Sequence, residues 1–278
     1  MSLYQNKKVL LASMHQKELA IQKPFEEIVG CKIEVVENFN TDQFGAFSGE
    51  IERVLTAYET LKKKAVVAAE QFNYDYVISS EGAFGPHPNY VFSNSDTEML
   101  LFYDRINDLY ISDFEISVET NLADYEIDSL EQDYGKFLDK VMFPSHALIV
   151  KAANNVIAKG VNNRDTLDAI IIENFAKYGK LKLETDMRAM NNPSRMKIIN
   201  LLANKLAKRV VSHCKSCDTP GFGITSLSGY LLCELCGLPT KIKKYREHKC
   251  IRCDYLEKEV IDLSKQFADP KYCDYCNP

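Results

Sequence analysis

Eight of the nine cysteines in this 278-residue chain form four Cys-x-x-Cys pairs, all of them after residue 213. Two such pairs supply four thiolates, which is the ligand set of a closed, structural zinc site. A segment this short, with few large apolar side chains, would fold poorly without the metal. The sequence therefore predicts a double zinc-ribbon domain over residues 211–278 with two structural zinc ions, held by Cys214, Cys217, Cys233, Cys236, Cys250, Cys253, Cys273 and Cys276.

The spacing of the cysteine pairs suggests which of them share an ion. Fifteen residues separate Cys217 from Cys233, and 19 separate Cys253 from Cys273. These intervals are typical of zinc ribbons and favour pairing in chain order, with a crossed arrangement as the alternative. The ninth cysteine, Cys31, is expected to fill a small apolar site.

The composition limits the classes of protein that this chain can belong to. Apolar residues make up 46%, enough for a sizeable core, and the net charge of −5 does not suit a molecule that binds nucleic acid or anionic lipid over its whole surface. The N-terminal apolar run is too short for a signal peptide, and no stretch approaches the roughly 20 apolar residues of a membrane span. We expect a soluble, cytoplasmic protein and leave its oligomeric state open.

The first 210 residues read as an α/β domain. A strand over 9–13, a helix to about 28 and a strand over 32–36 form a βαβ unit, which favours a parallel pair. Thr56 and Glu59 have the spacing of a capping box. The elements expected after it are a helix to about 72, a buried strand at 74–78, a hairpin of 98–104 with 109–112, a helix at 130–141, strands at 147–150 and 155–158, a helix capped by Asp165 that Gly179 ends, a strand at 181–183, and a helix that begins at Asn192-Pro193. The predicted fold is one mixed sheet flanked by helices.

The stretch from Ser79 to Pro88 is the most prominent candidate for chemistry. It follows the buried strand, and two glycines and two prolines constrain a backbone that carries Glu81 and His87. A polar loop at the end of a central strand is the usual place for the active site of an α/β protein. The alternative for His87 is that it only stiffens a turn.

Similar polar groups recur at other strand ends and helix starts, where a parallel arrangement would gather them at one edge of the sheet. Carboxylates suit Mg²⁺ or Mn²⁺, and arginine and lysine suit phosphate oxygens. The pattern predicts a metal-dependent hydrolase of nucleotide phosphates or a related phosphorylated substrate. The candidate catalytic residues are Glu50, Glu81, His87, His15 and Asp186, and the candidate phosphate-binding residues are Lys17, Arg53, Arg188 and Arg195. Each also has a structural alternative, such as a local ion pair of Arg53 with Glu50 or Glu52, or one within residues 184–188.

The cysteine-rich tail suggests a second class of function. Lysines and arginines between 241 and 252 surround Tyr245, a composition that can contact nucleic-acid phosphates, although acidic residues are nearly as numerous across the tail. The alternative function is therefore an adaptor that binds nucleic acid or protein through its ribbons, with the α/β domain sensing a ligand.

Several motifs resemble those of an uncharacterised bacterial domain family. They are Met14-His15-x-Lys17-Glu18, Thr41-Asp42-x-Phe44-Gly45-x-Phe47-Ser48-Gly49-Glu50-x-Glu52-Arg53, Ser80-Glu81-Gly82-x-Phe84-Gly85-Pro86-His87-Pro88, Phe143-Pro144-Ser145-His146, Glu184-Thr185-Asp186-Met187-Arg188-Ala189, Asn192-Pro193-x-Arg195-Met196 and the terminal ribbons. This resemblance covers nearly the whole chain and implies no activity. The order of elements in the N-terminal part is also similar to the house-cleaning inosine/xanthosine triphosphate pyrophosphatases. That resemblance implies phosphate binding by Lys17 and Mg²⁺ coordination by Glu81.

Overall fold

The computed structural model describes residues 2–36, 39, 56–90, 92–153 and 155–278. Contacts within the chain divide it into two compact units, Met1–Ala207 and Lys208–Pro278. The first unit has mixed α/β structure, as the sequence predicts, and the second contains all eight paired cysteines.

A five-stranded sheet with mixed strand directions forms the base of the first unit. Its strands are β1 (Lys8–Ala12), β2 (Lys32–Val35), β3 (Tyr76–Pro86), β4 (Asn94–Asp104) and β5 (Leu109–Ser117), in the order β2-β1-β3-β4-β5. The predicted βαβ unit is confirmed, since β1 pairs in parallel with β2 and also with β3. The other two pairings are antiparallel.

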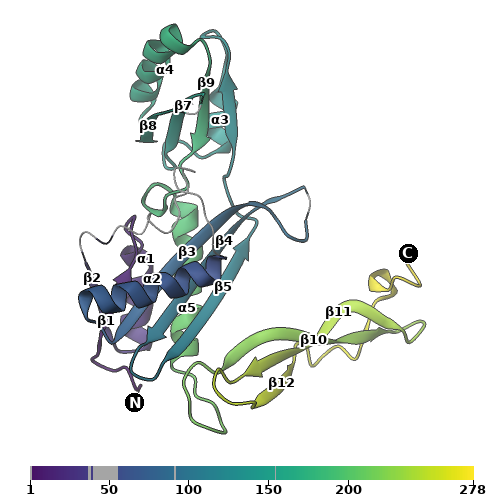
Figure 1. Ribbon diagram of the computed structural model, residues 1–278. Helices are drawn as coiled ribbons and strands as arrows, with labels where there is room; N and C mark the ends of the chain where they lie inside the picture. The colour runs from purple at the N-terminus through teal and green to yellow at the C-terminus, as the bar shows by residue number, and fades with distance from the viewer. Residues whose placement is uncertain (1, 37–38, 40–55, 91, 154) are drawn as a thin grey trace. The chain divides into compact units, whose positions relative to one another are not determined.

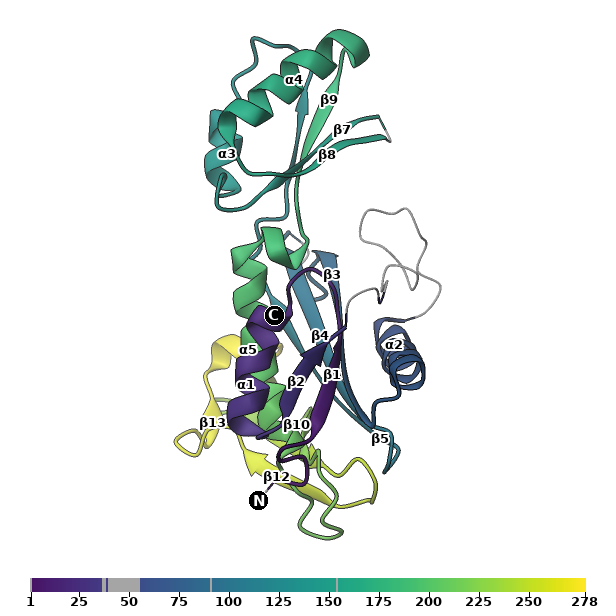
Figure 2. The same ribbon diagram turned by 90° about the vertical axis from the view of Figure 1, so that its left-hand side faces the viewer.

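Helices cover both faces of this sheet. Figure 2 shows α2 (Ala57–Phe72) on one side and α1 (Glu18–Ile28) with α5 (Pro193–Val210) on the other. The predicted capping box at Thr56 is present, and Asn192 accepts a hydrogen bond from the backbone of Arg195 at the start of α5. The apolar face of α2 packs on β1, β3 and β4 because its alanines allow close approach. None of the described helices has the length and hydropathy needed to cross a bilayer.

A second, antiparallel sheet follows in the same unit, where we had expected the first sheet to continue. Its order is β6-β9-β7-β8, with β6 (Asp124–Ile127), β7 (Leu148–Ala152), β8 (Asn155–Val161) and β9 (Leu181–Thr185). The short helix α3 (Gly135–Lys140) and the longer α4 (Arg164–Tyr178) bury its apolar face. The predicted mixed sheet flanked by helices is therefore confirmed, but these four strands do not join it, because they pair with one another and bury their own core.

Three local expectations also change. The stretch predicted as a loop after residue 78 is strand as far as Pro86, because its backbone pairs with β4 along its whole length. Helix α3 begins at Gly135 and not near residue 130. The N-cap of α4 is Asn163, whose side chain accepts from Thr166, and not Asp165; Gly179 ends the helix as predicted, in the left-handed conformation.

The second unit is a small four-stranded sheet with cysteine-bearing turns. Strands β10 (Gly223–Cys233) and β11 (Pro239–Lys249) form a long antiparallel hairpin, β12 (Leu256–Val260) pairs with β11, and β13 (Phe267–Ala268) pairs with β10. A 3₁₀ turn, η3 (Pro270–Tyr272), leads into the last cysteine pair (Figure 1).

Candidate functional site

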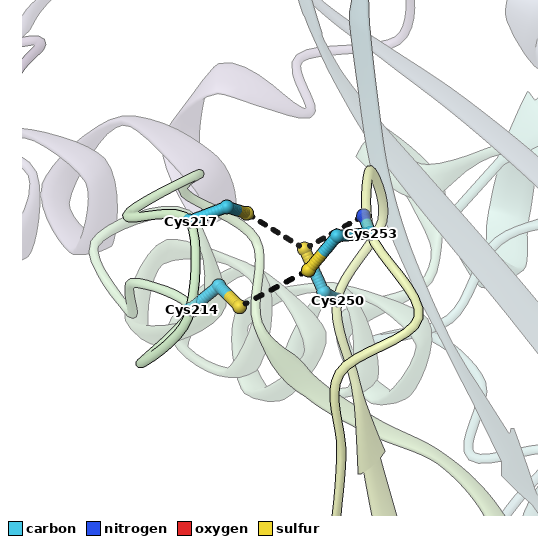
Figure 3. A group of neighbouring side chains, drawn as sticks. All are labelled: Cys214, Cys217, Cys250 and Cys253. Atoms are coloured by element: carbon cyan, nitrogen blue, oxygen red, sulfur yellow. Dashed lines mark hydrogen bonds between the residues drawn. The ribbon is translucent and has the colours of Figure 1, made fainter.

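The eight cysteines form two groups of four whose pairs are crossed along the chain. One group is Cys214, Cys217, Cys250 and Cys253, and the other is Cys233, Cys236, Cys273 and Cys276. The pairing in chain order that the spacing suggested is therefore wrong, and the alternative is correct. In Figure 3 the two pairs of the first group point toward one another from separate turns.

The hairpin explains the crossing. The beginning of β10 lies opposite the end of β11, with Gly223 beside Lys249, so Cys217 and Cys250 come to the same end. Cys233 and Cys236 lie at the other end, at the turn between the two strands. An antiparallel hairpin places its first and last residues together, and this separates cysteine pairs that are neighbours in sequence.

The geometry of both groups fits tetrahedral zinc. Four thiolates about 2.3 Å from an ion lie about 3.8 Å from one another. In the first group Cys214 Sγ is 3.7 Å from Cys253 Sγ, and Cys217 Sγ is 3.5 Å from Cys250 Sγ. In the second group the corresponding distances are 3.9 Å and 3.6 Å. With every position filled by sulfur, such sites stabilise the fold and leave no open position for catalysis.

A buried cluster of charged side chains lies in the first unit. Lys17, after β1, donates a hydrogen bond to Ser80 Oγ at 3.1 Å, and its Nζ is 3.7 Å from a carboxylate oxygen of Glu98. Glu98 also accepts from the Nε of Arg195 on α5. All three charged side chains are at least nine-tenths buried. Burial lowers the pKa of Lys17 to about 8, and the charge of Glu98 offsets part of that effect.

Two further residues shape this cluster. Asp96 lies two positions before Glu98 on β4, is 1% exposed, and has its pKa raised to about 8 by burial and by the charge of Glu98. Gly82 lies opposite Glu98, and a Cβ atom there would be 2.5 Å from Arg195 Nη2 and 2.7 Å from Glu98 Oε1. Only glycine at this position lets the guanidinium and the carboxylate meet over β3.

On the face covered by α2, Lys64 forms an ion pair with Glu81. Both side chains are buried. Lys64 is the last of three consecutive lysines at positions 62–64 of α2, and its side chain turns inward to Glu81. A buried pair of this kind is costly to break, because removal of one partner leaves an uncompensated charge.

A cavity of about 590 Å³ adjoins the cluster. Its walls come from both sheets of the first unit and combine apolar, cationic and acidic side chains. They include His15, Phe84, Gly85, Pro86, Asn94, Leu122, Asp124, Ile149, Lys151, Lys159, Glu184, Asp186, Met187 and Arg188. The guanidinium of Arg195 lies 5.0 Å from the ring centroid of Phe84 and donates to the carbonyl of Met187, so the buried cluster supports two residues of the wall.

The cavity brings together some of the residues that the sequence singled out. His15, in the left-handed conformation after β1, lies in its wall with Asp186 and Arg188. Asp186 is fully buried and accepts from Arg188 Nε at 3.0 Å and from Asn191. Burial opposes the ionisation of Asp186, but these hydrogen bonds outweigh it and hold its pKa below the usual value. Asp186 therefore fixes the guanidinium of Arg188 at the wall.

Other candidates lie elsewhere. The Nδ1 of His87 accepts hydrogen bonds from the backbone N–H groups of Asn89 and Tyr90, so this side chain stabilises the turn after β3. Lys17 and Arg195 belong to the buried cluster, and Glu81 to the opposite face of β3. Glu50 and Arg53 lie outside the described residues.

The sequence interpretation did not single out Asp96 or Glu98, and it treated Gly82 only as one of two glycines that constrain the backbone between Ser79 and Pro88. A signal for the two carboxylates was present, because Asp96, Glu98, Leu100 and Phe102 alternate along one strand and therefore share one face. Acidic side chains on the same face as core residues indicate buried charge. No comparable local signal marks Gly82, since its need for a small side chain comes from Arg195, more than a hundred residues away.

These features define a mixed α/β protein with a C-terminal module suited to two structural zinc ions. The chain belongs to the family described as domain of unknown function (DUF6671), whose model matches residues 64–278. No curated protein matches the chain.

Two solved structures are similar to parts of the chain. Protein VC0702 from Vibrio cholerae has 11% identity and a TM-score of 0.31, over 72% of this chain and 92% of its own. A variant PelC dodecamer from Paraburkholderia phytofirmans has 11% identity and a TM-score of 0.21, over 43% and 79%. The resemblance to inosine/xanthosine triphosphate pyrophosphatases finds no support in these comparisons.

Proposed function

We propose that the first unit binds a phosphorylated small molecule of about nucleotide size in its cavity and hydrolyses a phosphate bond. The observation that carries this proposal is the position of Arg188 in the cavity wall, held by the buried carboxylate of Asp186. A guanidinium with a fixed direction is suited to bind phosphate oxygens. The cavity volume lies within the range of small-molecule sites, and Phe84 offers a ring for a planar group.

The chemistry of the wall supports hydrolysis more than simple retention of the ligand. His15 gives the wall an imidazole, the side chain that most often acts as a general acid or base in enzymes. The buried charges of Lys17 and Arg195 lie behind the wall, where a low dielectric strengthens their attraction for a developing negative charge. The acidic side chains of the wall itself are Asp124, Glu184 and Asp186, whereas Glu81 is paired with Lys64 on the opposite face of β3. Among the described residues, only the cysteines form groups of three or more side chains close enough to hold a metal, so metal dependence is a question for the assay.

The test measures phosphate and pyrophosphate release from a panel of nucleotides by the full chain, with Mg²⁺ and with a chelator. Arg188→Ala should lower kcat/KM by about tenfold to a hundredfold, the worth of a charge-assisted hydrogen bond. Arg188→Lys should restore part of the loss. Arg164→Ala is the matched control, because Arg164 also pairs with a nearby aspartate, Asp168, but lies outside the cavity wall.

Binding is measured on the same panel by thermal stabilisation, with Arg188→Ala included. Stabilisation without turnover would refute hydrolysis and leave a ligand sensor. The absence of both stabilisation and turnover, or an Arg188→Ala variant as active as the parent, would refute the proposed site.

A further inference from the structure

The hairpin of the second unit carries two tyrosines on one face. Tyr230 on β10 lies opposite Lys243 on β11, and Tyr245 on β11 lies opposite Ser228. Residues opposite each other in an antiparallel pair share a face, so Tyr230 and Tyr245 are diagonal neighbours about 7–8 Å apart. Tyr230 is 47% exposed. The two rings therefore form a short aromatic row across two neighbouring strands.

Lysine ammonium groups lie close to both rings. Lys243 Nζ is 3.8 Å from the centroid of Tyr230, and Lys244 and Lys258 are 5.3 Å and 5.9 Å from that of Tyr245. A cation near the face of an aromatic ring is an attractive arrangement. The aromatic row is therefore also a row of positive charge.

The acidic side chains of this sheet are engaged by other partners. Glu247 accepts from Ser226 and pairs with Lys258 at 3.4 Å, while Glu259 pairs with Arg246 and His248. Within this wholly described unit, neither Lys243 nor Lys244 has a carboxylate within ion-pair distance. These two lysines can therefore meet a negative charge from outside.

We propose that this face binds single-stranded nucleic acid, with consecutive bases on Tyr230 and Tyr245 and phosphates at Lys243 and Lys244. Bases stack on aromatic side chains, and lysines follow the backbone between them. An acidic peptide would use the lysines but leave the rings without planar partners. A duplex would keep its bases paired and stacked inside. This binding function is independent of the hydrolysis proposed for the first unit, and a negative result for one does not affect the other.

The test is fluorescence anisotropy of the zinc-loaded full chain with labelled oligouridylate and oligothymidylate at low salt. Tyr230→Leu and Tyr245→Leu should each raise Kd by about fivefold to a hundredfold, the worth of one stacked base. The corresponding Tyr→Phe variants keep the ring and should bind as the parent does. Lys243→Gln should reduce the salt dependence of log K by about 0.7.

Tyr178→Leu is the matched control. Tyr178 is also exposed with a lysine over its ring, Lys177 Nζ at 4.9 Å, but it lies on α4 in the first unit. This variant should leave Kd unchanged. Tighter binding of one oligonucleotide would identify RNA or DNA as the ligand. Absence of binding to both, equal binding of a duplex, or unchanged affinity of both Tyr→Leu variants would overturn the proposal and assign the face to a protein partner or to none.

Discussion

Gly82→Ala is the sharpest test of the buried charge cluster. The new methyl group would lie 2.5 Å from Arg195 Nη2 and 2.7 Å from Glu98 Oε1. Non-bonded heavy atoms need about 3.5 Å, so the guanidinium and the carboxylate must each move by about 1 Å. Both groups are at most 1% exposed and have little room to do so. The expected loss is about 2–4 kcal/mol, between the cost of overpacking and that of breaking a buried ion pair.

The measurement is urea unfolding followed by a probe of the first unit, with the midpoint and the slope both determined. Gly85→Ala is the matched control, because Gly85 lies on the same strand and a Cβ there would meet nothing within 4 Å. It should change stability by no more than about 0.5 kcal/mol. Equal stability of the two variants would refute the close packing of Arg195 and Glu98 over β3.

Two other predictions concern protonation and zinc. The pKa of Asp96 is raised to about 8 in the fold, so its contribution to stability is present below its unfolded pKa and is lost as pH rises through about 8. The free energy of unfolding of the parent should therefore fall with pH between about pH 6 and 8, by up to about 1.4 kcal/mol per pH unit more than that of Asp96→Asn. Identical slopes for the two proteins would contradict a buried, protonated carboxyl group at Asp96. The amount of zinc bound per chain tests the crossed cysteine groups. Cys214→Ser with Cys250→Ser changes one group only and should leave one ion per chain, whereas Cys214→Ser with Cys233→Ser changes both groups and should leave none. Pairing in chain order would give the reverse result.

Features that depend on neighbours in sequence could be predicted well. The capping box at Thr56, the cap at Asn192 and the helix end at Gly179 are set by side chains and backbone within a few residues. The parallel pairing of β1 and β2 follows from the short helical crossover between them. Cys-x-x-Cys spacing likewise identifies the eight cysteines that form the two groups suited to a metal ion, because each turn supplies two thiolates by itself.

Part of the candidate site was also accessible from sequence. His15, Asp186 and Arg188 were identified as polar groups after strands, and all three lie in the cavity wall. The argument for bringing them together was incomplete, however, because β9 belongs to a second sheet that is antiparallel. They meet because the walls of the cavity come from both sheets.

The chain by itself determined which eight cysteines are suited to bind metal, the α/β class and the ends of several helices, since these depend on short-range spacing. Only the tertiary structure decided which cysteine pairs share a site, because the β10–β11 hairpin joins its first and last residues. It also decided that Lys64 reaches Glu81 and that Gly82 must be small. Such contacts depend on which distant segments meet, and the residue types of either segment alone do not specify the partner.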